Sequence, residues 1–116
     1  MSVRLRPVQA LKLWHEVGLS LVRRNGADLT QRQFVILLTI YLEPPPHTVR
    51  GLAFKLGVTK PVITRALDAM GDIDLVSRRR DPADRRNVII QRTVRGALFL
   101  EEFGDLIVER AELIAP

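Results

Sequence analysis

The sequence predicts a mainly α-helical fold with one small β-hairpin, an α+β class, and three observations predict it. Apolar residues recur at helical spacing in five segments of the chain. Between residues 75 and 92 this spacing gives way to two β-prone runs that flank a turn. The chain has 116 residues, of which 47% are hydrophobic, and we expect residues 1–116 to form a single domain with one compact core.

Composition narrows the classes of protein to consider. The chain has no cysteine, which excludes a disulfide framework, a thiolate metal site and a cysteine nucleophile. His15 and His47 match no metal-ligand spacing, and the sequence contains no nucleophile–base pattern or phosphate-binding glycine loop. We therefore expect no enzyme activity, no cofactor and no metal. A polar N-terminus and the lack of an apolar run of roughly 20 residues predict a cytoplasmic protein that binds no membrane.

The first two segments carry clear helix-end signals. Residues 1–26 form an N-terminal region with a helix over 7–24, which starts on a proline and stops at an asparagine–glycine pair. The apolar arc of this helix is wide for so small a protein. A second helix follows Thr30, which forms a capping box with Gln33, and three consecutive prolines at 44–46 end it.

Residues 49–71 are predicted to form two short helices joined by a tight turn. Thr48 caps the first helix, Gly57 closes it, and Thr59 caps the second. Two short helices joined by a glycine turn are typical of a helix-turn-helix, although a plain helical hairpin shares this pattern.

Residues 75–92 are predicted to form a β-hairpin. Its strands run over 75–80 and 87–92, and the residues between them have strong turn chemistry. A helix-turn-helix followed by a basic hairpin describes a winged helix-turn-helix. The hairpin is then the wing, and the second helix of the motif is the recognition helix.

Thr93 caps the last predicted helix, within a C-terminal region over 93–116. Two apolar stripes oppose its charged face, and one stripe suffices for packing on its own domain. The broad apolar arcs of 7–24 and 94–114 therefore predict that these flanking helices form a homodimer.

Positive charge is concentrated in the wing. Residues 76–95 contain seven arginines and two aspartates, which together account for the whole formal net charge of +5. A basic patch on a winged helix favours double-stranded DNA as the partner, whereas a solvated charged turn is the alternative. We expect Arg85 and Arg86 to form the groove-facing tip of the turn, from which an arginine enters the minor groove, with Asp81 or Asp84 fixing its guanidinium by a bidentate hydrogen bond.

Two groups of residues are the candidate DNA contacts. Alternation along the first strand places Arg78 and Arg80 on one face and Arg79 on the other. The candidates of the recognition helix are Thr59, Lys60, Pro61, Thr64 and Arg65, and those of the wing are Arg78, Arg80, Asp84, Arg85, Arg86 and Asn87.

The segments at 56–65, 75–86 and 93–96 together resemble the MarR family of bacterial transcription regulators, and the resemblance covers roughly residues 29–100. In that family the Asp-Pro-x-Asp-Arg-Arg turn is the wing. The resemblance implies a homodimer in the cytoplasm, associated with the nucleoid, that binds a pseudo-palindromic operator and usually represses. It also implies a small-molecule effector, commonly aromatic, that binds near the dimerisation helices.

Two features depart from the family pattern. Asp74 stands where the family usually has glycine, so the turn there is expected to differ. The chain also stops at Pro116, whereas family members generally continue into a further C-terminal helix that completes the dimer interface. The alternative function is therefore a winged-helix protein-interaction or assembly module without sequence-specific DNA binding.

Overall fold

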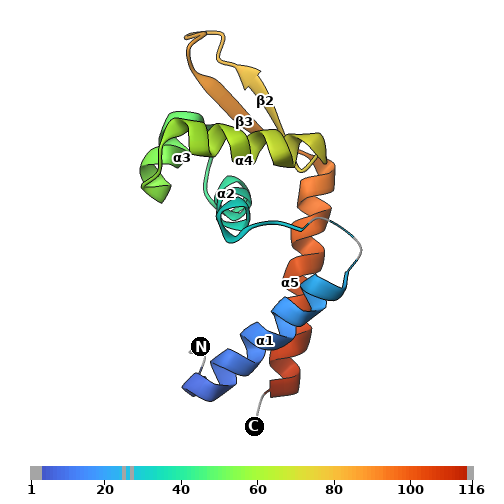
Figure 1. The fold of residues 1–116 in the computed structure, drawn as a ribbon. Helices are drawn as coiled ribbons and strands as arrows, with labels where there is room; N and C mark the ends of the chain where they lie inside the picture. Colours follow the sequence, from blue (N-terminus) through green and yellow to red (C-terminus); the bar gives the residue numbers. More distant parts are fainter. Residues whose placement is uncertain (1–3, 25, 27, 115–116) are drawn as a thin grey trace. The chain divides into compact units, whose positions relative to one another are not determined.

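The computed structural model describes residues 4–24, 26 and 28–114, and it divides into two compact units (Figure 1). The terminal unit contains the described residues up to Asp28 and from Glu101 onward, and the central unit is Leu29–Leu100. No helix among the described residues is long and apolar enough to cross a membrane.

The terminal unit contains α1 (Pro7–Arg23) and the later part of α5 (Val94–Ile114). Both helices end within one residue of their predicted bounds. Polar contacts join them: Arg24 Nη2 lies 3.1 Å from Glu102 Oε2, and Arg110 Nη2 donates to Ser20 Oγ at 3.2 Å.

The central unit packs three helices, α2 (Gln31–Leu42), α3 (Val49–Leu56) and α4 (Lys60–Asp72), around an aliphatic core. The helix-turn-helix is therefore present at the predicted residues. Seven large side chains of this core are fully buried, and they come from α2, α4 and the first strand of the hairpin: Ile36, Leu37, Ile40, Ile63, Leu67, Met70 and Val76.

Most of the predicted caps of the central unit are confirmed. Thr30 Oγ1 accepts the Gln33 N–H at 3.1 Å, and the Gln33 side chain accepts the Thr30 N–H at 2.8 Å. Thr48 Oγ1 accepts the Gly51 N–H at 3.0 Å. The prediction for Thr59 is wrong in one respect. It occupies the N-cap position of α4, but its side chain makes no capping hydrogen bond with any described residue.

The sheet of the central unit has three antiparallel strands in the order β1-β3-β2. The hairpin strands β2 (Val76–Arg80) and β3 (Val88–Arg92) each begin one residue later than predicted. The third strand, β1 (His47–Thr48), was not predicted, because two residues are too short to show an alternating pattern. It pairs with Ile89 and Ile90 of β3, so β2 is an edge strand whose one neighbour in the sheet is β3.

A hydrogen-bonded joint connects α2, the base of the hairpin and the start of α5. The Tyr41 hydroxyl accepts the Thr93 N–H at 2.9 Å and lies 3.0 Å from the Thr93 carbonyl oxygen. Thr93 Oγ1 accepts the Gly96 N–H at 2.9 Å, which confirms Thr93 as the cap of α5, and donates to the Asp74 carbonyl at 2.7 Å. Asp74 itself has a φ of +60°, which explains why the family favours glycine at this turn.

Candidate nucleic-acid interface

The outer face of α4 presents the side chains predicted for the recognition helix. The helix is amphipathic: Ile63, Ala66 and Leu67 are buried, while Thr64 and Arg65 between them face solvent. Thr59, Lys60, Pro61, Thr64 and Arg65 are all exposed. Their shared exposure leaves hydroxyl, ammonium and guanidinium groups available to a partner along one side of the helix.

The wing projects beyond α4 in the central unit (Figure 1), and its turn is held by hydrogen bonds around Asp81. The Asp81 N–H donates to the Asn87 carbonyl at 2.9 Å, and Asp81 Oδ1 accepts the Ala83 N–H at 2.9 Å. Asn87 Nδ2 donates to Asp81 Oδ2 at 3.3 Å. The hydrogen bond from Ala83, aided by the one from Asn87, lowers the pKa of Asp81 below its ordinary value of 3.8. Asp81 thus shapes the turn as a carboxylate.

The expected bidentate hydrogen bond between a tip arginine and an aspartate is not observed: the Arg86 guanidinium makes a single contact with Asp84, and the Arg85 guanidinium makes none with any described residue. Asp84 Oδ1 lies 3.5 Å from the Nε of Arg86, the neighbouring arginine, and accepts the Arg86 N–H at 3.1 Å. The guanidinium of Arg85 makes no hydrogen bond or ion pair with the described part of the chain. The reason is that both aspartates are engaged by loop backbone, so neither is aimed at Arg85.

Two arginines of β2 use their guanidinium groups inside the protein. Arg78 Nη1 lies 2.7 Å from Asp68 Oδ1 on α4, and Arg80 Nη1 donates to the Arg85 carbonyl at 2.7 Å. Asp68 is a functional candidate that the sequence analysis missed. Its position four residues after Thr64, on the exposed side of α4, was the available signal.

The remaining basic residues of the patch also divide into those that contact the protein itself and those that stay exposed. Arg92 donates from Nε to the Ile40 carbonyl at 3.0 Å and lies over the Tyr41 ring, so it serves the domain itself. Arg95 is exposed at the start of α5. The structure therefore leaves fewer arginines available to a partner than the composition of the patch suggests.

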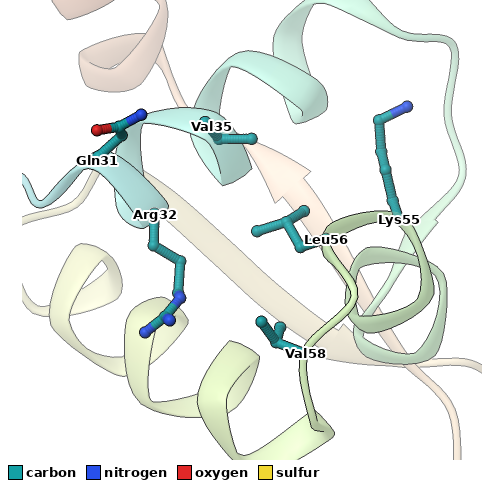
Figure 2. Close-up of a pocket in the computed structure, with 6 residues that line it drawn as sticks. All are labelled: Gln31, Arg32, Val35, Lys55, Leu56 and Val58. Atoms are coloured by element: carbon teal, nitrogen blue, oxygen red, sulfur yellow. The ribbon is translucent and has the colours of Figure 1, made fainter.

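A shallow hollow of about 410 Å³ lies beside the turn of the helix-turn-helix. Figure 2 shows Leu56, at the end of α3, and Val58, in the turn, lining it, and Arg32 extending from α2 toward α4. Lys55, at its edge, is 2.6 Å from Glu43 Oε2. Over the described ranges, no group of three or more His, Cys, Asp or Glu side chains could hold a metal ion.

Several solved structures are similar to this chain. A variant of MepR from S. aureus bound to an oligodeoxyribonucleotide is 21% identical with a TM-score of 0.80, and the match covers 92% of this chain and 76% of that one. A variant of MarR from E. coli complexed with operator DNA is 25% identical with a TM-score of 0.68, and the match covers 90% and 69%. The transcriptional repressor CouR bound to a 23-mer DNA duplex is 28% identical with a TM-score of 0.71, and the match covers 89% and 70%.

The family model described as the MarR family matches residues 29–88, which is more than half of the chain. These residues include α2, the helix-turn-helix and the turn of the wing, and the central unit has the winged-helix fold that the solved structures share. The chain belongs to the MarR family of transcription regulators.

Proposed function

We propose that this protein is a sequence-specific, double-stranded DNA-binding regulator that represses transcription as a homodimer on a pseudo-palindromic operator. One observation carries the proposal: the exposed face of α4 and an arginine-tipped wing lie in the same compact unit of a MarR-family chain. Two similar solved structures, a MarR variant complexed with operator DNA and CouR bound to a 23-mer DNA duplex, support it. The site of action would be the bacterial cytoplasm, at the nucleoid.

The contacts follow from the shapes of the two elements. The α4 helices of a dimer would enter successive major grooves about 34–36 Å apart, where Thr64 and Arg65 meet base edges. Thr59 and Lys60 would meet phosphates at the start of the helix. The wing would follow the adjacent minor groove, with Arg85 and neighbouring Arg86 at its tip.

Homodimerisation is supported by exposed apolar side chains in the terminal unit. Leu11 and Trp14 of α1 are each 70% exposed, although aromatic and aliphatic side chains of that size usually lie in a core. Val8 and Val22 continue the same side of α1 at helical spacing, and Leu113 of α5 is also exposed. A second copy of the chain would cover these side chains through 7–24 and 94–114. The proposal places a small-molecule effector near these helices.

The experiment that tests the proposal is selection of bound fragments from a random pool of duplex DNA, followed by titration of the selected site at several salt concentrations. We expect a site with two-fold symmetry and half-sites about 10–10.5 base pairs apart. The logarithm of affinity should fall with the logarithm of salt concentration by about 0.9 for each phosphate contacted.

The competing function is a winged-helix module that binds another protein through the wing. Failure to enrich any duplex, together with co-purification of a second polypeptide that dissociates when Arg85 and Arg86 are neutralised, would replace the DNA-binding proposal with this one.

A further inference from the structure

The middle of the edge strand β2 is tied to α4 by one ion pair. Arg78 Nη1 lies 2.7 Å from Asp68 Oδ1, and only 33% of the Arg78 side chain is exposed. The terminal guanidinium nitrogen Nη2 lies against the side of α4 near Gly71. Arg78 therefore runs across the join between the wing and the helix, with its charged end on Asp68.

We infer that Asp68 and Arg78 are positioning residues that clasp the wing to the recognition helix, and that Arg78 acts on DNA binding through this clasp. The inference rests on the proposed function, because it concerns the geometry of the proposed DNA-binding surface. Arg80 extends the same arrangement toward the tip, where its guanidinium holds the Arg85 carbonyl at 2.7 Å.

The topology explains why the wing needs such a clasp. β1 pairs with β3 only at Ile89 and Ile90, so the Arg80–Val88 pair and the turn beyond it have no third strand beside them, and β2 has no strand on its outer side. Two-stranded ribbons are marginally stable and twist strongly. The ion pair from β2 to α4 supplies lateral support that the sheet does not. A wing fixed against α4 loses less conformational freedom when both elements meet one duplex.

Arg78 could either contact a phosphate or clasp the wing to α4, and these two roles predict opposite effects of Asp68→Asn on the affinity for DNA. If Arg78 contacted a phosphate, Asp68 would be an acid that repels DNA, and Asp68→Asn would raise the affinity for the selected duplex. If the pair is a clasp, Asp68→Asn releases the wing and lowers that affinity. The pair is partly exposed, so we expect a loss of about three- to fivefold.

Asp72 supplies a matched control, since it is an exposed acid on the same helix with no ion pair to any described residue. Asp72→Asn should leave the affinity unchanged or raise it slightly. Equal effects of the two substitutions, or a gain in affinity with Asp68→Asn, would overturn the clasp.

The salt dependence of binding separates Arg78 from a phosphate-contacting arginine. Arg78→Met should lower affinity with an unchanged log–log slope, whereas Arg85→Met should reduce the slope by about 0.9. The exchanged pair, Asp68→Arg with Arg78→Asp, keeps the net charge and restores the ion pair. We expect it to recover to within about twofold of the wild-type affinity. A reduced slope for Arg78→Met, or no recovery in the exchanged pair, would contradict the inference.

A DNA-free measurement distinguishes failure of the clasp from failure of the proposed function. Asp68→Asn should speed hydrogen exchange of the amides in β2 and β3, whereas Asp72→Asn should not. If exchange is faster but no duplex is ever bound, the clasp stands and the DNA-binding proposal fails. If exchange and affinity both match the wild type, the clasp fails.

Discussion

Arg85 sits at the tip of the wing, where its carbonyl is held by Arg80 and its guanidinium has no partner in the described chain. We predict that Arg85→Ala weakens binding to specific and non-specific duplexes alike, by about tenfold, because it removes a contact to the backbone or to the minor groove. Fluorescence anisotropy on both duplexes measures this. Arg79→Ala is the control, since Arg79 alternates to the other face of β2. Equal losses for the two variants would mean that the tip has no special role.

We expect the order of the wing to depend on pH through Asp81. The pKa of Asp81 is lowered in the folded protein, chiefly by the hydrogen bond from the Ala83 N–H. The carboxylate of Asp81 therefore stabilises the folded turn at pH values above its ordinary pKa of 3.8. This contribution is lost as the pH falls through the lower, folded-state pKa. We predict that the amide signals of residues 81–87 lose their dispersion in this acidic window, as followed by NMR. Asp81→Asn takes up no proton there, so a transition that persists in this variant would assign it to another group.

Single residues also show where sequence reasoning reaches its limit. The cap at Thr30 was predictable, because it depends on neighbours within three residues. The turn at Asp74 was expected to differ from a glycine turn, whereas Asp74 adopts the positive φ that glycine favours. The contact between Asp68 and Arg78 was not predictable, because its partners lie on different elements and their meeting depends on how β2 packs against α4. The sequence also placed Asp81 and Asp84 in the wing turn and predicted a bidentate hydrogen bond to an arginine. In the structure their oxygens accept hydrogen bonds from the loop, and one contact joins Asp84 to Arg86.

At the scale of elements, the joint between α2 and α5 leaves no space for a side chain at Gly96. A Cβ atom there would collide with the Tyr41 hydroxyl and the Leu75 carbonyl oxygen. We predict that Gly96→Ala lowers the free energy of unfolding by about 1–3 kcal/mol, because the joint must open to admit the methyl group. Chemical denaturation followed by circular dichroism provides the measurement.

The same helix offers a control with the opposite sign. A Cβ at Gly104 has no atom within 4 Å, so Gly104→Ala should stabilise α5 by about 0.5–1 kcal/mol. Tyr41→Phe tests the joint from its other side. It leaves the Thr93 N–H without its acceptor and should cost about 1–3 kcal/mol. A Gly96→Ala variant as stable as Gly104→Ala would show that the joint does not hold α5 in this way.

Element order and helix bounds were predicted well because helices are specified locally, by apolar spacing and end residues. Strand β1 was missed because its two residues become a strand only through pairing with Ile89 and Ile90 of β3. Trp14 illustrates a different limit of what the sequence predicts. The apolar arc of α1 predicts that this face of the helix is buried but does not specify what covers it, and Trp14 is exposed in the single chain. Helical periodicity thus identifies a contact surface and leaves the partner open.

At the scale of the whole molecule, the exposed apolar side of α1 provides the last prediction. Trp14 and Leu11 lie three residues apart and are both largely exposed, so a second copy that covers them buries an aromatic anchor at the centre of the interface. We predict a dimer for the wild type in sedimentation equilibrium, and at least a roughly 30-fold weaker dimer for Trp14→Ser, as expected for loss of a buried interfacial tryptophan.

Lys12 on the polar side of α1 gives the matched control, and Lys12→Ser should leave the dimer intact. Because the recognition face and wing lie in the central unit, Trp14→Ser should preserve the circular dichroism spectrum and the weak binding of one half-site. It should lose the tight binding of the full two-fold site, since joining two half-sites raises the effective concentration of the second. A monomeric wild type that binds the full site as tightly as we expect of the dimer would disprove the dimer, and the protein would then be a monomeric DNA-binding protein.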